Sequence, residues 1–152
     1  MLDFSLQRGL EDCLARNVQG GFYLIDNVFR QDSRFNNCHE LVTFIDNHDM
    51  PRFLSNGATP KRMEMALALI LTARGTPCIY YGTEQYLHND TNWGADPYNR
   101  PMMEKWDTDT QAFRLIKALS AVRKANRGVQ RGGHRVKYLN ENVYAYTRVY
   151  RA

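Results

Sequence analysis

Hydrophobic residues recur at intervals of three or four positions in three stretches of the chain, a spacing that places them on one face of a helix. The three predicted helices cover residues 5–17, 61–74 and 108–126. Thr59 followed by Pro60 is a typical start for the second helix, because the threonine caps it and a proline in the first turn has no intrahelical hydrogen bond to lose. We expect Thr108 and Gln111 to form a capping box at the start of the third helix.

Short apolar runs lie before and between these helices. Residues 41–45 and 78–81 are rich in β-forming side chains and predict two buried strands, and residues 1–4 form a shorter apolar piece. Residues 22–35 fit neither pattern and are interpreted as a long loop with a short helix. The alternation of strand and helix is typical of the parallel βα units of α/β proteins. Three such units cannot close a barrel, which needs eight units and typically about 250 residues.

The last part of the chain has a different pattern. Residues 135–139 and 143–150 flank the turn sequence Asn140-Glu141-Asn142, which predicts a β-hairpin. Gly128 marks the boundary before it. We therefore divide the chain into residues 1–127, an α/β unit, and residues 128–152, the first strands of a truncated β domain.

Composition and charge narrow the class of protein. The chain is 43% hydrophobic and 24% charged, as in ordinary globular proteins, and no apolar run approaches the roughly 20 residues of a membrane span. The net charge is +4, and residues 112–152 hold 10 Lys/Arg against one acid, Glu141. A basic segment can bind nucleic acid. Here the charges fall between apolar positions and no nucleic-acid motif is present, so we favour a solvated face.

The candidate chemistry begins where the strand at residues 41–45 ends. Asn47, His48 and Asp49 follow it directly. In parallel α/β proteins the carboxyl ends of the strands carry the chemistry, since the loops there vary while the strands hold them in place. Two further motifs, residues 75–85 and Asp96-Pro97-Tyr98-Asn99-Arg100, follow along the chain. Together the three motifs resemble the α-amylase superfamily of glycoside hydrolases, most closely its cyclodextrin glucanotransferases and maltogenic amylases.

This resemblance implies a fold and an activity. Residues 1–127 would be the C-terminal part of a catalytic (β/α)8 barrel, its last three βα units, with residues 1–4 resembling the sixth strand. The activity would be that of a retaining glycosidase or transglycosidase acting on α-1,4-glucans. The family's nucleophile and acid/base belong to earlier strands, as does its usual calcium site. The resemblance thus implies no cofactor within this chain, an inactive isolated fragment and a secreted parent enzyme.

The resemblance also assigns roles to four residues. Asp49 matches the family's third carboxylate, which holds sugar hydroxyls and stabilises the transition state, and His48 resembles its sugar-binding histidine. Asp96 and Arg100 resemble residues that bind sugar hydroxyls further along the glucan. Each role has a structural alternative: a helix N-cap for Asp49, a buried core histidine for His48, and a loop salt bridge for Asp96 with Arg100.

Other polar and aromatic residues are less specific. Trp93 and Trp106 either stack on glucose rings or anchor their loops, Glu84 is expected to brace a loop, and no metal-ligand set is predicted. The predicted function is a fragment of an enzyme that acts on α-1,4-glucans. The alternative is a non-catalytic carbohydrate-binding or structural fragment, and a nucleic-acid binder is a third interpretation.

Overall fold

The structure, a computed structural model, describes residues 1–151. Its helices are α1 (Phe4–Leu10), which continues into a π-helical turn (Glu11–Ala15), α2 (Gly21–Arg30), α3 (Pro60–Thr72), α4 (Gln111–Ala125) and α5 (Arg127–Arg131). Its strands are β1 (Val42–Thr43), β2 (Thr76–Pro77), β3 (Gly133–Leu139) and β4 (Tyr144–Val149). None of the helices within residues 1–151 is long and apolar enough to cross a membrane.

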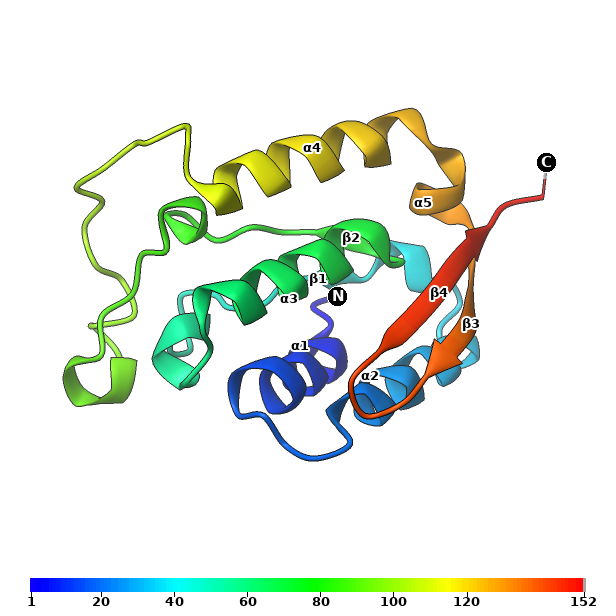
Figure 1. The fold of residues 1–152 in the computed structure, drawn as a ribbon, viewed down its shortest axis with the longest axis horizontal. Helices are drawn as coiled ribbons and strands as arrows, with labels where there is room; N and C mark the ends of the chain where they lie inside the picture. Colours follow the sequence, from blue (N-terminus) through cyan, green and yellow to red (C-terminus); the bar gives the residue numbers. More distant parts are fainter. Residues whose placement is uncertain (152) are drawn as a thin grey trace.

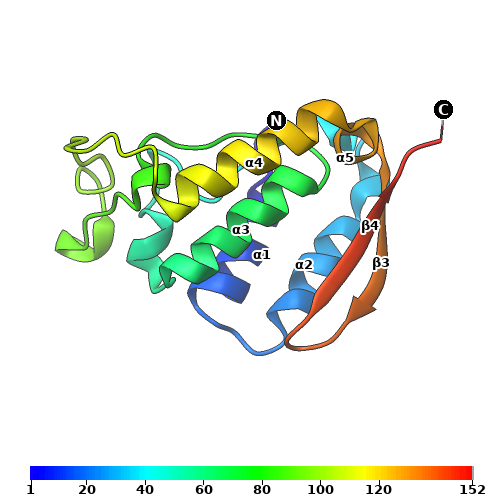
Figure 2. The ribbon, with the colours of Figure 1, turned by 45° about the horizontal axis from the view of Figure 1, so that its top comes forward.

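The helices form the body of the molecule (Figure 1). Helices α3 and α4 lie side by side, α1 packs against α2, and the hairpin β3–β4 lies beside α2 in both ribbon views (Figure 2). The long loop between β2 and α4 extends from the opposite end of the molecule. The core fills the space between α1, α2 and α3, with Leu6, Leu10, Ile25, Leu67 and Ile70 fully buried.

Three extended segments run parallel, as the strand–helix alternation predicts. Val42 and Thr43 of β1 pair with Thr76 and Pro77 of β2, and Leu2 forms a parallel bridge to Val42 on the other side. The strand predicted at residues 78–81 begins two residues earlier in the structure, where Thr76 and Pro77 pair with β1. Beyond it the Thr83 N–H donates to the Tyr80 carbonyl and turns the chain away.

Two helix predictions need correction. The short helix expected within residues 22–35 is the ten-residue helix α2, which begins at Gly21 and whose Ile25 and Phe29 face the core one turn apart. Gly21 opens this helix so close to the first helical segment that a Cβ there would lie 2.5 Å from the Cα of Cys13. The cap of α4 is Thr110 and not Thr108: its hydroxyl accepts the Phe113 N–H at 3.0 Å.

Two arginines connect elements that are distant in the sequence. Arg74, just before β2, is buried between two carboxylates: it pairs with Asp3, and its Nε donates to Asp32 Oδ1 at 2.7 Å. Arg123 on α4 donates to the carbonyls of Leu71, Ala73 and Gly75. A helix end leaves such carbonyls without partners, so Arg123 closes the C-terminal end of α3. Part of the positive charge of the C-terminal segment therefore serves the fold.

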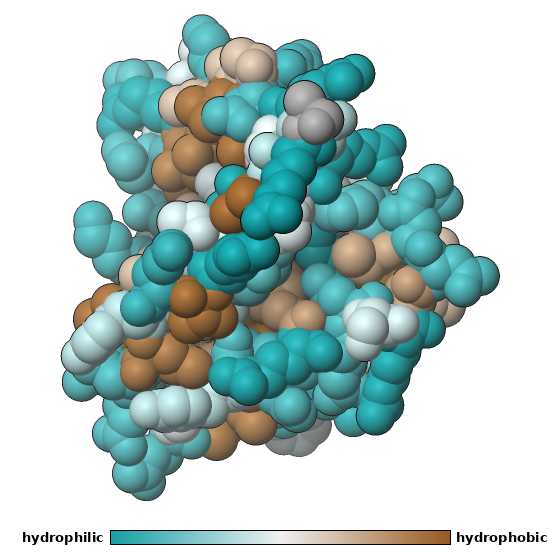
Figure 3. All heavy atoms as spheres, turned by 90° about the vertical axis from the view of Figure 1, so that its right-hand side faces the viewer, coloured by the Kyte–Doolittle hydropathy of each residue, from teal (hydrophilic) through white to brown (hydrophobic). Residues whose placement is uncertain are grey.

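The predicted hairpin is confirmed. Strands β3 and β4 pair antiparallel from Gly133↔Val149 to Leu139↔Tyr144. The hairpin contacts α2 through aromatic rings. His134 of β3 stacks on Phe29 of α2, with 4.2 Å between the ring centroids, and on Tyr146 of β4, with 4.5 Å between them. Figure 3 shows the hairpin side of the molecule, where hydrophilic residues cover most of the face and hydrophobic residues form separate patches.

His134 makes this contact sensitive to pH. Burial, followed by the charge of Arg148, lowers the pKa of His134 to about 4, against about 6.5 in an unfolded chain. Between these values the unfolded state binds more protons, so stability falls as pH falls through that window. We expect acidification from pH 7 to pH 5 to remove about 2 kcal/mol through this group.

Urea unfolding of the wild-type chain and of His134→Phe at both pH values measures this contribution. The phenylalanine keeps the ring stacking but does not titrate, so its pH dependence between 5 and 7 should be smaller by that amount. His88→Phe is the matched control, because His88 is an exposed histidine in the long loop. An unchanged pH dependence in His134→Phe would contradict the assignment.

Candidate functional site at the end of strand β1

A buried carboxylate shapes the loop that follows β1. Asp46 Oδ2 accepts the Phe53 N–H at 2.8 Å and the Arg52 Nε at 3.1 Å, both within the protein interior. These bonds close residues 46–53 into a compact turn. On its outer side the Asn47 side chain accepts the Asp49 N–H at 2.8 Å. His48 and Asp49 therefore project into solvent, with side chains 62% and 70% exposed.

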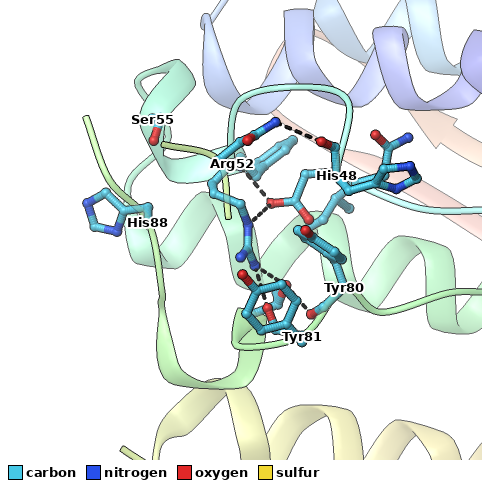
Figure 4. A network of polar contacts seen from close by, with 12 residues as sticks. His48, Arg52, Ser55, Tyr80, Tyr81 and His88 are labelled. Carbon is cyan, nitrogen blue, oxygen red and sulfur yellow. Dashed lines mark hydrogen bonds and ion pairs between the residues drawn. The ribbon is translucent and has the colours of Figure 1, made fainter. Parts of the chain in front are cut away.

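Arg52 joins this turn to the loop that follows β2. Its guanidinium is 1% exposed and donates to the Tyr81 carbonyl at 2.9 Å and to Thr83 Oγ1 at 3.1 Å. It also lies over the Tyr80 ring, 4.5 Å from the centroid. Figure 4 shows Arg52 between the turn that carries His48 and the two tyrosines. The loops after two neighbouring strands thus form one rigid unit.

The long loop after β2 contacts the turn that carries His48 and Asp49. Asn99, which is buried, donates to the His48 carbonyl at 2.8 Å, and Arg100 Nε donates to the same oxygen at 3.1 Å. Arg100 Nε lies 3.2 Å from Asp96 Oδ1, and its Nη2 lies 3.8 Å from Asp49 Oδ1. His48 Nε2 lies 3.2 Å from the same Asp49 oxygen. All four residues singled out in the sequence therefore come together.

The geometry bears on the structural alternatives. His48 is exposed and not a core histidine, and the next helical turn, Phe53–Asn56, has Arg52 at its N-cap and not Asp49. The alternative for Asp96 and Arg100, a loop salt bridge, is present at 3.2 Å. Exposed ion pairs contribute about 0–1 kcal/mol, so this one can open for a ligand. The functional roles of the four residues stay predictions.

The cluster offers a particular set of hydrogen-bonding groups. Asp49 and Asp96 provide carboxylate acceptors, Arg100 provides up to five donor hydrogens, and His48 provides one donor and one acceptor when neutral. Such a mixed, exposed set suits a ligand with many hydroxyl groups, each of which both donates and accepts. Within residues 1–151 no group of three or more His, Cys, Asp or Glu side chains could hold a metal ion.

Sequence reasoning missed the residues that support this site. Asp46, Arg52 and Asn99 are buried polar side chains, and each holds a loop in place. The signal for the first two was available, because an aspartate inside an apolar strand with an arginine six residues later is a candidate buried pair. Glu84 contributes to its loop through its backbone carbonyl, which accepts from the Thr110 hydroxyl.

Comparisons with known proteins identify the family. Residues 21–114 match the family model described as alpha amylase, catalytic domain. The chain belongs to the α-amylase family. The relatives include cyclomaltodextrin glucanotransferase of Thermoanaerobacterium thermosulfurigenes, 40% identical over 148 residues that make up 97% of this chain and 20% of that protein. An alpha-amylase of Niallia circulans is 37% identical over 97% of this chain and 27% of its own length.

Solved structures agree with this membership. The crystal structure of CldA, described as the first cyclomaltodextrin glucanotransferase with a three-domain ABC distribution, superposes with a TM-score of 0.94 at 48% identity. The match covers 98% of this chain and 30% of that one. The chain thus spans only about a fifth of the length of the first curated relatives. Its α/β fold corresponds to part of an α-amylase catalytic domain.

Proposed function

We propose that this chain supplies the last three βα units of the catalytic barrel in a retaining glycosidase or transglycosidase that acts on α-1,4-glucans. The single observation that carries the proposal is the cluster of His48, Asp49, Asp96 and Arg100 at the carboxyl end of β1, in a chain of the α-amylase family. Residues 128–152 would begin the β domain that follows the barrel.

In this proposal Asp49 acts on the transition state. Retaining glycosidases use a nucleophile and an acid/base about 5–5.5 Å apart, and their transition state resembles an oxocarbenium ion. We assign those two groups to the parent protein outside this chain. The Asp49 carboxylate would accept hydrogen bonds from the sugar hydroxyls and favour the positive charge that develops on the ring. His48 would orient Asp49 through Nε2 and form a hydrogen bond to the same sugar through its other ring nitrogen.

Arg100 would hold the glucan in place. Its guanidinium lies between Asp49 and Asp96, and the His48 carbonyl fixes its Nε. A planar guanidinium with several free donors can bind two hydroxyls of one sugar at once. Calcium, which the family resemblance places in the parent enzyme, would be bound by residues outside this chain, and none of these steps depends on it.

A segment exchange tests the proposal. The matching 148 residues of the Thermoanaerobacterium thermosulfurigenes enzyme are replaced by this chain, and the hybrid is assayed on starch and on maltodextrins. We expect an active hybrid, while the isolated 152-residue chain should not hydrolyse starch. A hybrid that folds but is inactive, with the host nucleophile and acid/base in place, would favour the structural alternative.

Arg100→Ala in the hybrid should raise KM for maltodextrins about tenfold and change kcat by less than about threefold. An interaction made equally in the ground state and the transition state lowers KM without raising kcat, and hydrogen bonds to charged groups contribute about 1.5–3 kcal/mol. Arg100→Lys is the control, because it keeps the charge and loses the planar fork. A fall in kcat with unchanged KM would place Arg100 at the reacting sugar instead.

A further inference from the structure

Trp93 lies exposed on a turn with an unusual backbone. Asn92, Trp93 and Gly94 all have left-handed conformations, with φ of 49°, 55° and 72°. This conformation is unfavourable for residues other than glycine, so surrounding contacts must maintain it. The Trp93 side chain is nevertheless 84% exposed. The turn therefore presents an indole to solvent at an energetic cost.

This turn is held by the loop that carries Asp49 and by a hydrogen bond of its own. Ser55 Oγ donates to the Asn89 carbonyl at 3.4 Å, and the Asn89 side chain accepts the Thr91 N–H at 2.9 Å. Gly94 lies so close to Ser55 that a Cβ there would be 2.9 Å from the Ser55 Cβ. Ser55 belongs to the helical turn Phe53–Asn56, directly after Arg52. Ser55 thus holds the turn of Trp93 against the loop that carries Asp49.

The indole of Trp93 takes no part in these contacts. The ring contacts found among residues 1–151 include no pair with Trp93, and its backbone N–H bonds to the Asp90 carbonyl at 3.0 Å. Of the two sequence interpretations, loop anchor or stacking surface, the loop anchor does not describe these contacts. The indole is therefore free to contact a ligand.

The same loop contains an open hollow with a mixed lining. Residues 87–90, 101, 102 and 104 line this hollow, which has a volume of about 600 Å³. His88, Asn89, Asp90 and Glu104 line it with polar groups, while Met102 supplies an apolar surface. Binding sites for small molecules combine apolar surface with a few convergent polar groups in this way. The first segment of its lining ends at Asp90, three residues before Trp93 along the chain.

We propose that Trp93 is a stacking surface for a glucose ring of the bound α-glucan and forms an additional subsite beside Asp96 and Arg100. This inference rests on the proposed function. The apolar face of a pyranose ring would lie on the indole, and its hydroxyls would reach the polar groups of the hollow. The subsite would select longer glucans, because a short glucan bound at Asp49 would not extend to it.

The chain offers a direct measurement, since it contains two tryptophans, Trp93 and Trp106. In Trp106→Phe, Trp93 is the sole indole, and titration with maltoheptaose should give a saturable change in its fluorescence. By calorimetry, Trp93→Ala should weaken maltoheptaose binding roughly three- to tenfold, the effect of losing one aromatic contact. Trp93→Phe should retain part of the affinity.

Trp106→Ala is the matched control. Trp106 is 73% exposed on the limb of the same loop that leads into α4. Its removal should change the affinity by less than about twofold, the lower limit of an aromatic contact. Equal weakening by Trp93→Ala and Trp106→Ala would overturn the inference, as would an unresponsive Trp93 fluorescence at saturating maltoheptaose.

The outcomes separate this inference from the proposed function. Binding that Arg100→Ala weakens and Trp93→Ala leaves unchanged rejects the Trp93 subsite and keeps the function. Binding that Trp93→Ala weakens and Arg100→Ala leaves unchanged keeps the subsite and rejects the site around Asp49. No binding of maltoheptaose by the wild-type chain overturns the Trp93 subsite, and the activity of the hybrid on starch then decides the proposed function separately.

Discussion

Asp49→Asn in the hybrid enzyme is expected to lower kcat by roughly 10²–10³-fold, the effect of removing one group that stabilises developing charge. The substitution keeps the shape of the side chain and removes its negative charge. Because the carboxylate is 70% exposed and makes only peripheral contacts with His48 and Arg100, the fold should not change. The loss should therefore appear in kcat and leave the unfolding temperature within a few degrees.

Asp96→Asn is the matched control, since it removes the other exposed carboxylate that faces Arg100. We expect a rise in KM and a fall in kcat below about tenfold, because a group that only binds the glucan contributes equally to ground state and transition state. Near-normal kcat in a folded Asp49→Asn hybrid would remove Asp49 from the mechanism. Equal losses of kcat for the two variants would mean that neither has a special role.

Part of the fold could be predicted because its signals are local. Thr59 caps α3 through the Arg62 N–H, as its place before Pro60 indicates. The start and length of helix α2 were underestimated for the opposite reason. Its two opening glycines are typical of a turn that ends a helix, whereas Gly21 allows the close approach to Cys13, which no local pattern reveals.

The candidate site could also be predicted only in part from the sequence. The position of His48 and Asp49 at a strand end follows from the sequence pattern alone. The position of Arg100 beside them could not be predicted in this way. It depends on Asn99, which donates to the carbonyl of His48, 51 residues earlier in the sequence. A loop of polar residues and glycines has many conformations, and the partly buried hydrogen bond of Asn99 selects among them. Such long-range contacts are visible only in the folded chain.

The buried pair of Asp46 and Arg52 is the contact on which this geometry depends most. Both side chains are almost inaccessible, 3% and 1% exposed, and Arg52 also holds Tyr81 and Thr83 in the neighbouring loop. Removal of one partner from a buried pair leaves an uncompensated charge and typically costs about 3–5 kcal/mol. We therefore expect Arg52→Ala to lower the free energy of unfolding of the chain by that amount, as measured by urea unfolding at pH 7.

Two comparisons identify the origin of this loss. Arg114→Ala breaks an exposed pair with Asp109 and should cost less than about 1 kcal/mol. The double variant Asp46→Asn with Arg52→Met removes both charges but keeps an acceptor for the Phe53 N–H, so it should recover part of the stability. If the double variant is as unstable as Arg52→Ala, the loss comes from packing and not from the unpaired charge.

The pH dependence of the destabilisation by Arg52→Ala also distinguishes an unpaired Asp46 charge from lost packing. Burial raises the pKa of Asp46 even beside Arg52, and loss of the guanidinium should raise it further. A carboxyl group whose pKa is higher in the folded state favours folding as pH falls, because the folded chain then takes up the proton more readily. The destabilisation by Arg52→Ala should accordingly shrink between pH 7 and pH 4. A loss that is constant across this range would show that Asp46 is not left charged, and that Arg52 acts through its contacts with Tyr81 and Thr83.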